Sequence, residues 1–163
     1  MRGIRRVLPP LLLVLSVLLA GCGIRPSGVA GAGEPLTGLA PGVTLYFVGG
    51  DGRLEPQLRR TGRLGTVSEA VSLLLSGPGD AGLRTEIGPA ATRQVVVTTA
   101  SATIRLMVPL TVDKVTARGI DQIVCTALGV HVQGGGARQT RVQVQFVQPT
   151  PESATKRACP LFT

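Results

Sequence analysis

Residues 43–60 read VTLYFVGGDGRLEPQLRR, a stretch that predicts a β-hairpin at the start of the folded region. In residues 43–48 apolar side chains recur at alternate positions, and alternate positions of a strand share one face. Residues 49–52, GGDG, supply the positive-φ positions that a tight reversal requires. Pro56 has no amide donor, so the returning strand is expected to be an edge or irregular strand.

The next segment, residues 66–78 with the sequence TVSEAVSLLLSGP, predicts an amphipathic helix. Thr66 and Glu69 have the spacing of a capping box, in which the hydroxyl accepts from a free amide and the carboxylate reaches back to the cap. Gly77-Pro78 ends the helix. Its apolar stripe consists of Val67, Ala70, Val71, Leu74 and Leu75.

The same two periodicities continue to the end of the folded region. They predict strands at residues 94–99, 103–108 and 141–147, a second helix at residues 116–128 and a loop at residues 79–92. The order is therefore β-β-α-β-β-α-β. We expect an α+β fold, with an antiparallel or mixed sheet of four to five strands and two helices packed on one face.

The N-terminal residues indicate where the chain works. Arginines precede an apolar run at residues 7–19 that has secretory length but is shorter than the roughly 20 residues of a membrane-spanning helix. Leu19-Ala20-Gly21-Cys22 resembles the cleavage site of bacterial lipoproteins, with cleavage between Gly21 and Cys22 and a diacylglycerol placed on the cysteine. The alternative is an ordinary signal peptide that leaves Cys22 as a free thiol.

Composition divides the chain into four parts. Residues 1–21 are predicted to be the lipoprotein signal peptide, and residues 22–42, rich in Gly, Pro, Ser and Ala, a flexible tether. Residues 43–148 are the expected folded domain, and residues 149–163 a C-terminal tail without regular structure. The predicted location is the cell membrane, with a lipid anchor on the extracytoplasmic face.

The chain is basic, but arginine dominates in a way that is typical of a GC-rich genome. The full sequence has 17 Lys+Arg and 9 Asp+Glu; losing three arginines with residues 1–21 leaves 14 against 9, a net charge of +5. Anionic lipids or anionic wall polymers are therefore plausible weak partners. Nucleic acid is not expected, because export separates the protein from it and aromatic side chains are few and scattered.

Two further cysteines remain once Cys22 is acylated. An even number of thiols in an exported chain favours a disulfide, so we predict that Cys125 and Cys159 are bridged. They are 159 − 125 = 34 positions apart, and closing such a loop stabilises a fold by about 4 kcal/mol in the chain-entropy model. The bridge would tie the tail to the domain. The alternative is two unpaired thiols, with Cys125 buried.

The hairpin VTLYFV-GGDG-RLEP, the helix SEAVSLLLSGP, the segment GLRTEIGP and the helix DQIVCTAL occur in an order and spacing that resemble the GerMN domain. This family is named for the sporulation and germination protein GerM. The resemblance covers residues 43–147 and implies an extracytoplasmic, often lipid-anchored, non-enzymatic domain with a fold similar to ring-building modules. It also implies a lipoprotein subgroup of high-GC Gram-positive bacteria that carries Cys125 and Cys159-Pro160.

The chain departs from the family pattern in two ways. It has a single copy of the domain, whereas the sporulation protein has two, which puts a sporulation role in doubt. Its last strand lacks the Asp-Gly turn that is common at the C-terminal edge of the family.

Residues suited to catalysis are scarce. His131 is the sole histidine and is expected in a solvated turn just after the second helix. No serine occupies a G-x-S-x-G motif, the acidic residues are scattered, and one histidine with two bridged cysteines does not make a zinc site. We therefore expect no enzyme and no cofactor apart from the acyl lipid on Cys22. An envelope hydrolase with paired carboxylates is a weaker alternative.

Protein–protein interaction at the membrane surface is the preferred function, because a small sheet offers an edge or an uncovered face for contact. A contact patch is predicted at Arg59, Arg60, Arg63 and Arg84, with a solvated basic surface as the alternative. Binding to peptidoglycan or another cell-wall polymer is the second hypothesis. It is poorly supported, since the chain has no Trp and only Tyr46 as a tyrosine.

Overall fold

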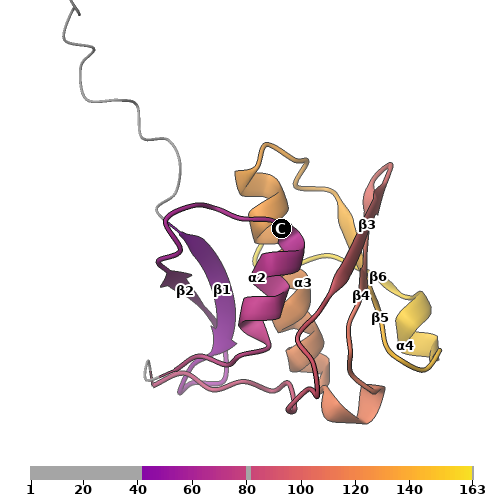
Figure 1. Ribbon diagram of the computed structural model, residues 1–163, viewed down its shortest axis with the longest axis horizontal. Helices are drawn as coiled ribbons and strands as arrows, with labels where there is room; N and C mark the ends of the chain where they lie inside the picture. Colours follow the sequence, from indigo (N-terminus) through magenta and orange to yellow (C-terminus); the bar gives the residue numbers. More distant parts are fainter. Residues whose placement is uncertain (1–41, 80–81, 163) are drawn as a thin grey trace, which may run out of the picture. The chain divides into compact units, whose positions relative to one another are not determined.

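The computed structural model describes residues 42–79 and 82–162 (Figure 1). The predicted signal peptide, the Gly21–Cys22 site and the tether lie outside these residues. The α+β class is confirmed. The elements are β1 (Val43–Val48), β2 (Leu54–Arg59), α2 (Val67–Leu74), β3 (Val96–Ala100), β4 (Thr103–Met107), η2 (Val112–Lys114), α3 (Ala117–Gln133), β5 (Arg141–Gln145), α4 (Pro151–Ala154) and β6 (Lys156–Arg157).

The expected single sheet is wrong, because the described strands form two sheets. β1 and β2 make an antiparallel hairpin, and a second sheet has the order β3-β4-β5-β6 with a parallel pairing of β4 and β5. Helices α2 and α3 lie between the sheets (Figure 1), and α3 contacts β1 on one side and β5 on the other. The helices therefore do not cover one face of one sheet.

The edge of β1 explains why the two sheets stay separate. The amide of Tyr46 donates to Thr126 Oγ1 at 3.1 Å, and Gln122 Nε2 donates to the carbonyl of Tyr46 at 3.1 Å. At the end of the strand, Val48 exchanges two backbone hydrogen bonds with Arg84. Side chains of α3 and one loop residue thus satisfy the outward backbone groups of Tyr46 and Val48, to which another strand would have to bind.

Helix α2 begins as the sequence predicts. Thr66 Oγ1 accepts from the amide of Glu69, and the amide of Thr66 donates to Glu69 Oε2 at 2.7 Å, which completes the capping box. The helix buries Ala70, Val71 and Leu74 in the core.

Helix α3 is longer than the predicted residues 116–128. All residues from Gln122 to Val130 are buried, so this segment is covered on every side rather than along one stripe. A helix buried all round is expected only inside a protein. The extension arises because Val130 and Val132 continue to pack on the core.

The C-terminal residues also differ from the prediction. Cys125 and Cys159 form a disulfide, as expected from the sequence. The segment that it holds is not structureless, however, because α4 packs on β5 and β6 pairs with β5. Thr150 caps α4, and Pro151 at its first position fits a helix start. The fold therefore extends past the expected boundary at residue 148, to Phe162, whose ring meets that of Tyr46 edge-on.

Within the part of the chain that the structure describes, no helix has both the length and the apolar character needed to cross a membrane.

Replacing Gln122 with leucine should lower the free energy of unfolding by about 3 kcal/mol, since one buried and one partly buried backbone group would lose their partners. These are the carbonyl of Tyr46 and the amide of Glu86, which donates to Gln122 Oε1 at 2.8 Å. The measurement is denaturant unfolding. Gln133→Leu is the matched control on the exposed end of α3 and should change stability by less than about 0.5 kcal/mol. Equal effects of both substitutions would contradict this account of the β1 edge.

Replacing Cys125 and Cys159 together with alanine should remove about 4 kcal/mol, because the 34-residue loop is no longer closed in the unfolded chain. Equilibrium unfolding of the variant and of the chemically reduced wild type should give matching midpoints. If the reduced wild type keeps the stability of the oxidised protein, the bridge does not stabilise the fold.

Candidate functional site

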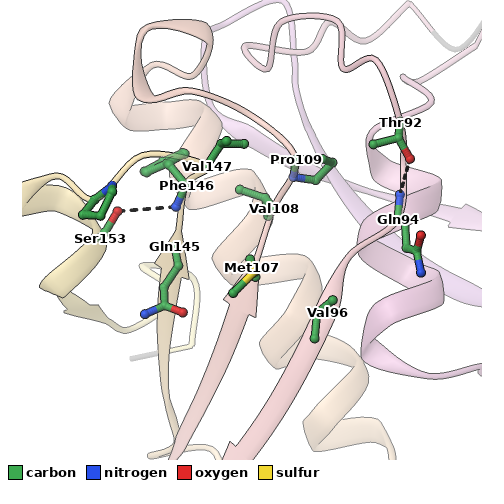
Figure 2. Close-up of a pocket in the computed structure, with 11 residues that line it drawn as sticks. Thr92, Gln94, Val96, Met107, Val108, Pro109, Gln145, Phe146, Val147 and Ser153 are labelled. Carbon is green, nitrogen blue, oxygen red and sulfur yellow. Dashed lines mark hydrogen bonds between the residues drawn. The ribbon is translucent and has the colours of Figure 1, made fainter.

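The outer face of the four-stranded sheet, which points away from α3, ends in an apolar groove of about 630 Å³ (Figure 2). Three large apolar side chains are exposed in it. Val96 is 53%, Met107 54% and Val147 63% accessible to solvent. Exposed apolar side chains that cluster in this way mark surfaces for ligands or partners.

Strand alternation places these side chains together. Val96 on β3 is the cross-strand neighbour of Met107 on β4, and Met107 is next to Gln145 on β5. Ile104 and Leu106 occupy the alternate positions of β4 and are buried against the core. Because side chains of a strand alternate between faces, the buried pair forces Met107 outward.

The C-terminal segment forms one wall of the groove. Ser153 on α4 lines it, and Ser153 Oγ accepts from the amide of Phe146 at 3.4 Å (Figure 2). The carbonyl of Ser153 accepts from Gln143 Nε2 at 2.7 Å. The segment held by the disulfide therefore helps to shape this surface.

The groove offers contact chemistry. Its polar lining consists of hydroxyl and amide side chains from Thr92, Gln94, Gln145 and Ser153, and none of its lining residues is ionisable. Such a surface can bury apolar side chains and hydrogen bond to a peptide backbone. Elsewhere among the described residues, no three His, Cys, Asp or Glu side chains gather in a way that could hold a metal ion.

The structure does not bring the four arginines of the predicted contact patch together. Arg59 is paired with Val43 at the start of β1, whereas Arg84 bridges Val48 at the other end. The two therefore lie at opposite ends of one strand, and extended geometry keeps them apart.

The arginines of this set are also used within the fold. Arg59 Nη2 donates to the carbonyl of Gly77 at 3.1 Å, and Arg63 forms a two-pronged ion pair with Glu69. Arg60 and Arg63 are both exposed to solvent.

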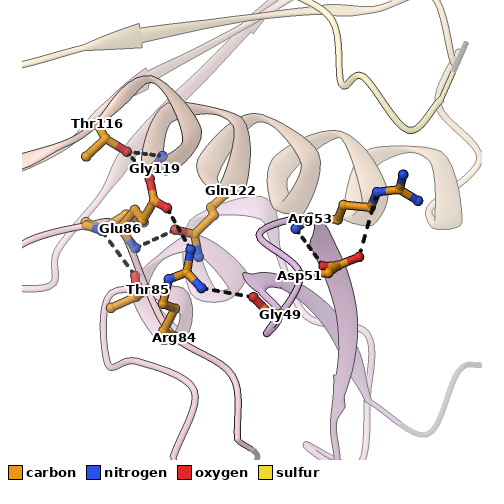
Figure 3. A network of polar contacts seen from close by, with 10 residues as sticks. Gly49, Asp51, Arg53, Arg84, Thr85, Glu86, Thr116, Gly119 and Gln122 are labelled. Carbon is orange, nitrogen blue, oxygen red and sulfur yellow. Dashed lines mark hydrogen bonds and ion pairs between the residues drawn. The ribbon is translucent and has the colours of Figure 1, made fainter.

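Arg84 belongs to a network that joins the loop before β3 to the start of α3 (Figure 3). Its Nη1 donates to the carbonyl of Gly49 at 3.0 Å, and the neighbouring Glu86 accepts from Thr116, the cap of α3. A Cβ at Gly119 would lie 2.3 Å from the carbonyl of Glu86, so only glycine permits this approach. The network holds the loop in place.

The sequence predicts a solvated turn at His131, but the structure places this residue in the last turn of α3. Its Nε2 is 3.1 Å from Thr140 Oγ1 in a partly buried contact. The position follows from the extension of α3 past residue 128.

Sequence reasoning missed the groove. Its signal was present in the strand patterns, because Val96 alternates with the partly buried Val97 of β3, and Met107 with the buried Ile104 and Leu106 of β4. A polar residue is expected at such positions on a solvated face.

Glu69 gives a test of the ion pair. The hydrogen bond from Arg63, followed by those from Thr66, lowers the pKa of Glu69 from 4.5 to about 2. A carboxylate whose pKa is lowered by folding stabilises the fold above its unfolded pKa and loses this effect as the pH falls through the folded value. The stability difference between wild type and Glu69→Gln should therefore shrink between about pH 4.5 and 2.

The measurement is the thermal unfolding midpoint over that pH range. Arg63→Gln, which removes the first cause of the lowered pKa, should weaken the same pH dependence. A wild-type advantage that is equal at every pH would contradict the assignment.

Comparison with known proteins finds no match to this chain among protein-family models, curated proteins or solved structures. The GerMN resemblance therefore rests on the residues of the sequence and stays a prediction.

Proposed function

We propose that this chain is a membrane-anchored lipoprotein of the extracytoplasmic face, with a non-enzymatic GerMN-like domain that binds another envelope protein. The Leu19–Cys22 sequence supports the anchor. The Cys125–Cys159 disulfide supports an oxidising compartment, since such bonds persist mainly outside the cytoplasm. The proposal includes a fold similar to that of ring-building modules, in which helices pack against strands.

The observation that carries the interaction function is the apolar groove on the outer face of the four-stranded sheet. Three apolar side chains are more than half exposed there, namely Val96, Met107 and Val147. Contact of apolar side chains with water is unfavourable, so a partner that covers them would gain binding free energy. The lining favours a protein partner, because apolar pockets with amides and hydroxyls suit side chains and peptide groups.

Binding to a cell-wall polymer is the second candidate, and the net positive charge favours it. Sugar recognition usually needs an exposed aromatic face. Tyr46 is only 9% exposed and packs edge-on against Phe162, so it is not free to stack on a sugar. The apolar groove therefore favours binding to a protein over binding to a cell-wall polymer.

The anchor is tested in cells that express the full chain with and without Cys22→Ser. The wild type should incorporate labelled palmitate and sediment with membranes, whereas Cys22→Ser should do neither, because the thiol is the site of acylation. Palmitate labelling of Cys22→Ser, or no labelling of the wild type, would remove the anchor from the proposal.

The interaction is tested with a photo-crosslinking amino acid at Met107 in the full chain. One dominant envelope protein should be captured from this position. The same probe at Gln133, exposed at the end of α3, is the control and should not capture it. Salt-resistant pelleting with isolated cell wall, without a dominant protein neighbour, would instead favour polymer binding.

A further inference from the structure

The outer edge of β3 carries backbone groups that the fold leaves open. The residues that flank β4 show which of its backbone groups face β5. The carbonyl of Ala102 accepts from the amide of Arg141, and the amide of Val108 donates to the carbonyl of Gln145. Backbone groups of a strand alternate between its two neighbours. Thr103, Arg105 and Met107 therefore bond toward β3.

The register then fixes which groups of β3 face outward. Thr103, Arg105 and Met107 pair with Ala100, Thr98 and Val96. The intervening residues, Val97 and Thr99, must direct their amides and carbonyls away from β4. The carbonyl of Val95, two residues earlier, also points to this side and accepts from Ser68 Oγ at 2.5 Å. Among the described residues, no comparable bond reaches Val97 or Thr99.

The other strand edges of the described sheets are less open to an added strand. The edge of β1 is bound by Gln122 and Thr126. The backbone amide of Tyr46 points toward α3 and away from β2. The backbone groups of its pairing partner Pro56 therefore point away from β1, and proline has no amide to donate there. β6, at the far side of the second sheet, is only two residues long.

Proteins usually protect open edges with proline, charge or short length. β3 has the sequence VVTTA, with five residues and neither proline nor charge. It is thus the edge best suited to strand addition, and it borders the apolar groove.

The side chains on the outer face beside β3 indicate what kind of strand could bind at this edge. Val96 and Met107 form an apolar row, and the next row on the same face pairs Thr98 with Arg105, about 7 Å along the strand. The guanidinium of Arg105 donates to the neutral Gln143 Oε1 at 3.4 Å, and no acidic residue of the described part of the chain forms an ion pair with it. Of the basic residues in strands β3 to β6, Arg105, Arg141 and Lys156 lie on this outer face, whereas Arg157 is paired with the buried Val142 on the opposite face. These strands contain no acidic residue.

We propose that β3 accepts an extended segment of the partner as an additional strand, and that this segment carries an apolar residue and, two positions away, an acidic residue. The apolar side chain enters the groove beside Val96 and Met107, and the carboxylate lies beside Thr98 within reach of Arg105. This inference rests on the proposed interaction function and specifies its partner. A second copy of the chain is disfavoured, because it would bring the same positive charges to the face.

The first test uses the full chain in cells with a photo-crosslinking residue at Thr98. Thr99→Pro removes an outward amide without removing a bond to β4, and Thr99→Ala keeps that amide. Capture of the partner should be lost in Thr99→Pro and kept in Thr99→Ala. Circular dichroism and the unfolding midpoint of the purified variants establish that both are folded.

The outcomes separate the two proposals. If Thr99→Pro is folded and still captures the partner, strand addition is overturned while the interaction function stands. If the wild type captures no protein from Thr98 or Met107, both are overturned. A product with twice the mass of the chain identifies a second copy and overturns the acidic partner.

The second test needs no variant of the edge. Full chain purified in detergent is titrated with a short fluorescent peptide in which one threonine separates a leucine from a glutamate. Replacing the glutamate with lysine, or methylating the backbone amides of the peptide that face β3, should weaken binding about tenfold, the effect of losing one good hydrogen bond or ion pair. Arg105→Glu should reverse the preference between the two peptides. Equal binding of all peptides, or no binding of the glutamate peptide, would overturn the proposal.

Discussion

Two hydrogen bonds between side chains of α3 and the backbone of Tyr46 close the edge of β1, and the two-layer arrangement around α3 depends on them. They require Gln122 and Thr126 to be buried, which is favourable only because both side chains are bonded. They also bring the hairpin against one side of α3 while the four-stranded sheet covers the other. The helix therefore packs against both sheets, and its buried side chains form one hydrophobic core with theirs.

Local signals made much of the fold predictable. The hairpin, the capping box at Thr66 and the apolar stripes depend on neighbouring residues, so their positions could be inferred from the sequence. The separation into two sheets could not, because a polar residue such as Gln122 on a helix normally indicates a solvated face. Only its partner, distant in sequence, shows that it replaces a strand.

The candidate site was hidden for a related reason. Met107 is an apolar residue, and an apolar residue in a strand normally indicates a side chain that faces the core. A single sequence therefore does not show that Met107 is exposed. The predicted arginines had the opposite problem. Arg59 and Arg63 are prominent in the sequence, but their charges are engaged by nearby carbonyls and by Glu69. The short elements α4 and β6 lie below the length at which periodicity is informative.

The distance in sequence between the two halves of the β1 edge has a kinetic consequence. Tyr46 and Thr126 are 80 positions apart, so β1 is synthesised long before the residues that cover it. A two-stranded hairpin is marginally stable alone, and contacts between such distant residues form slowly because of the entropy of closing the loop. The domain is therefore expected to fold in one late, cooperative step, with its first strand open to chaperones until α3 has emerged.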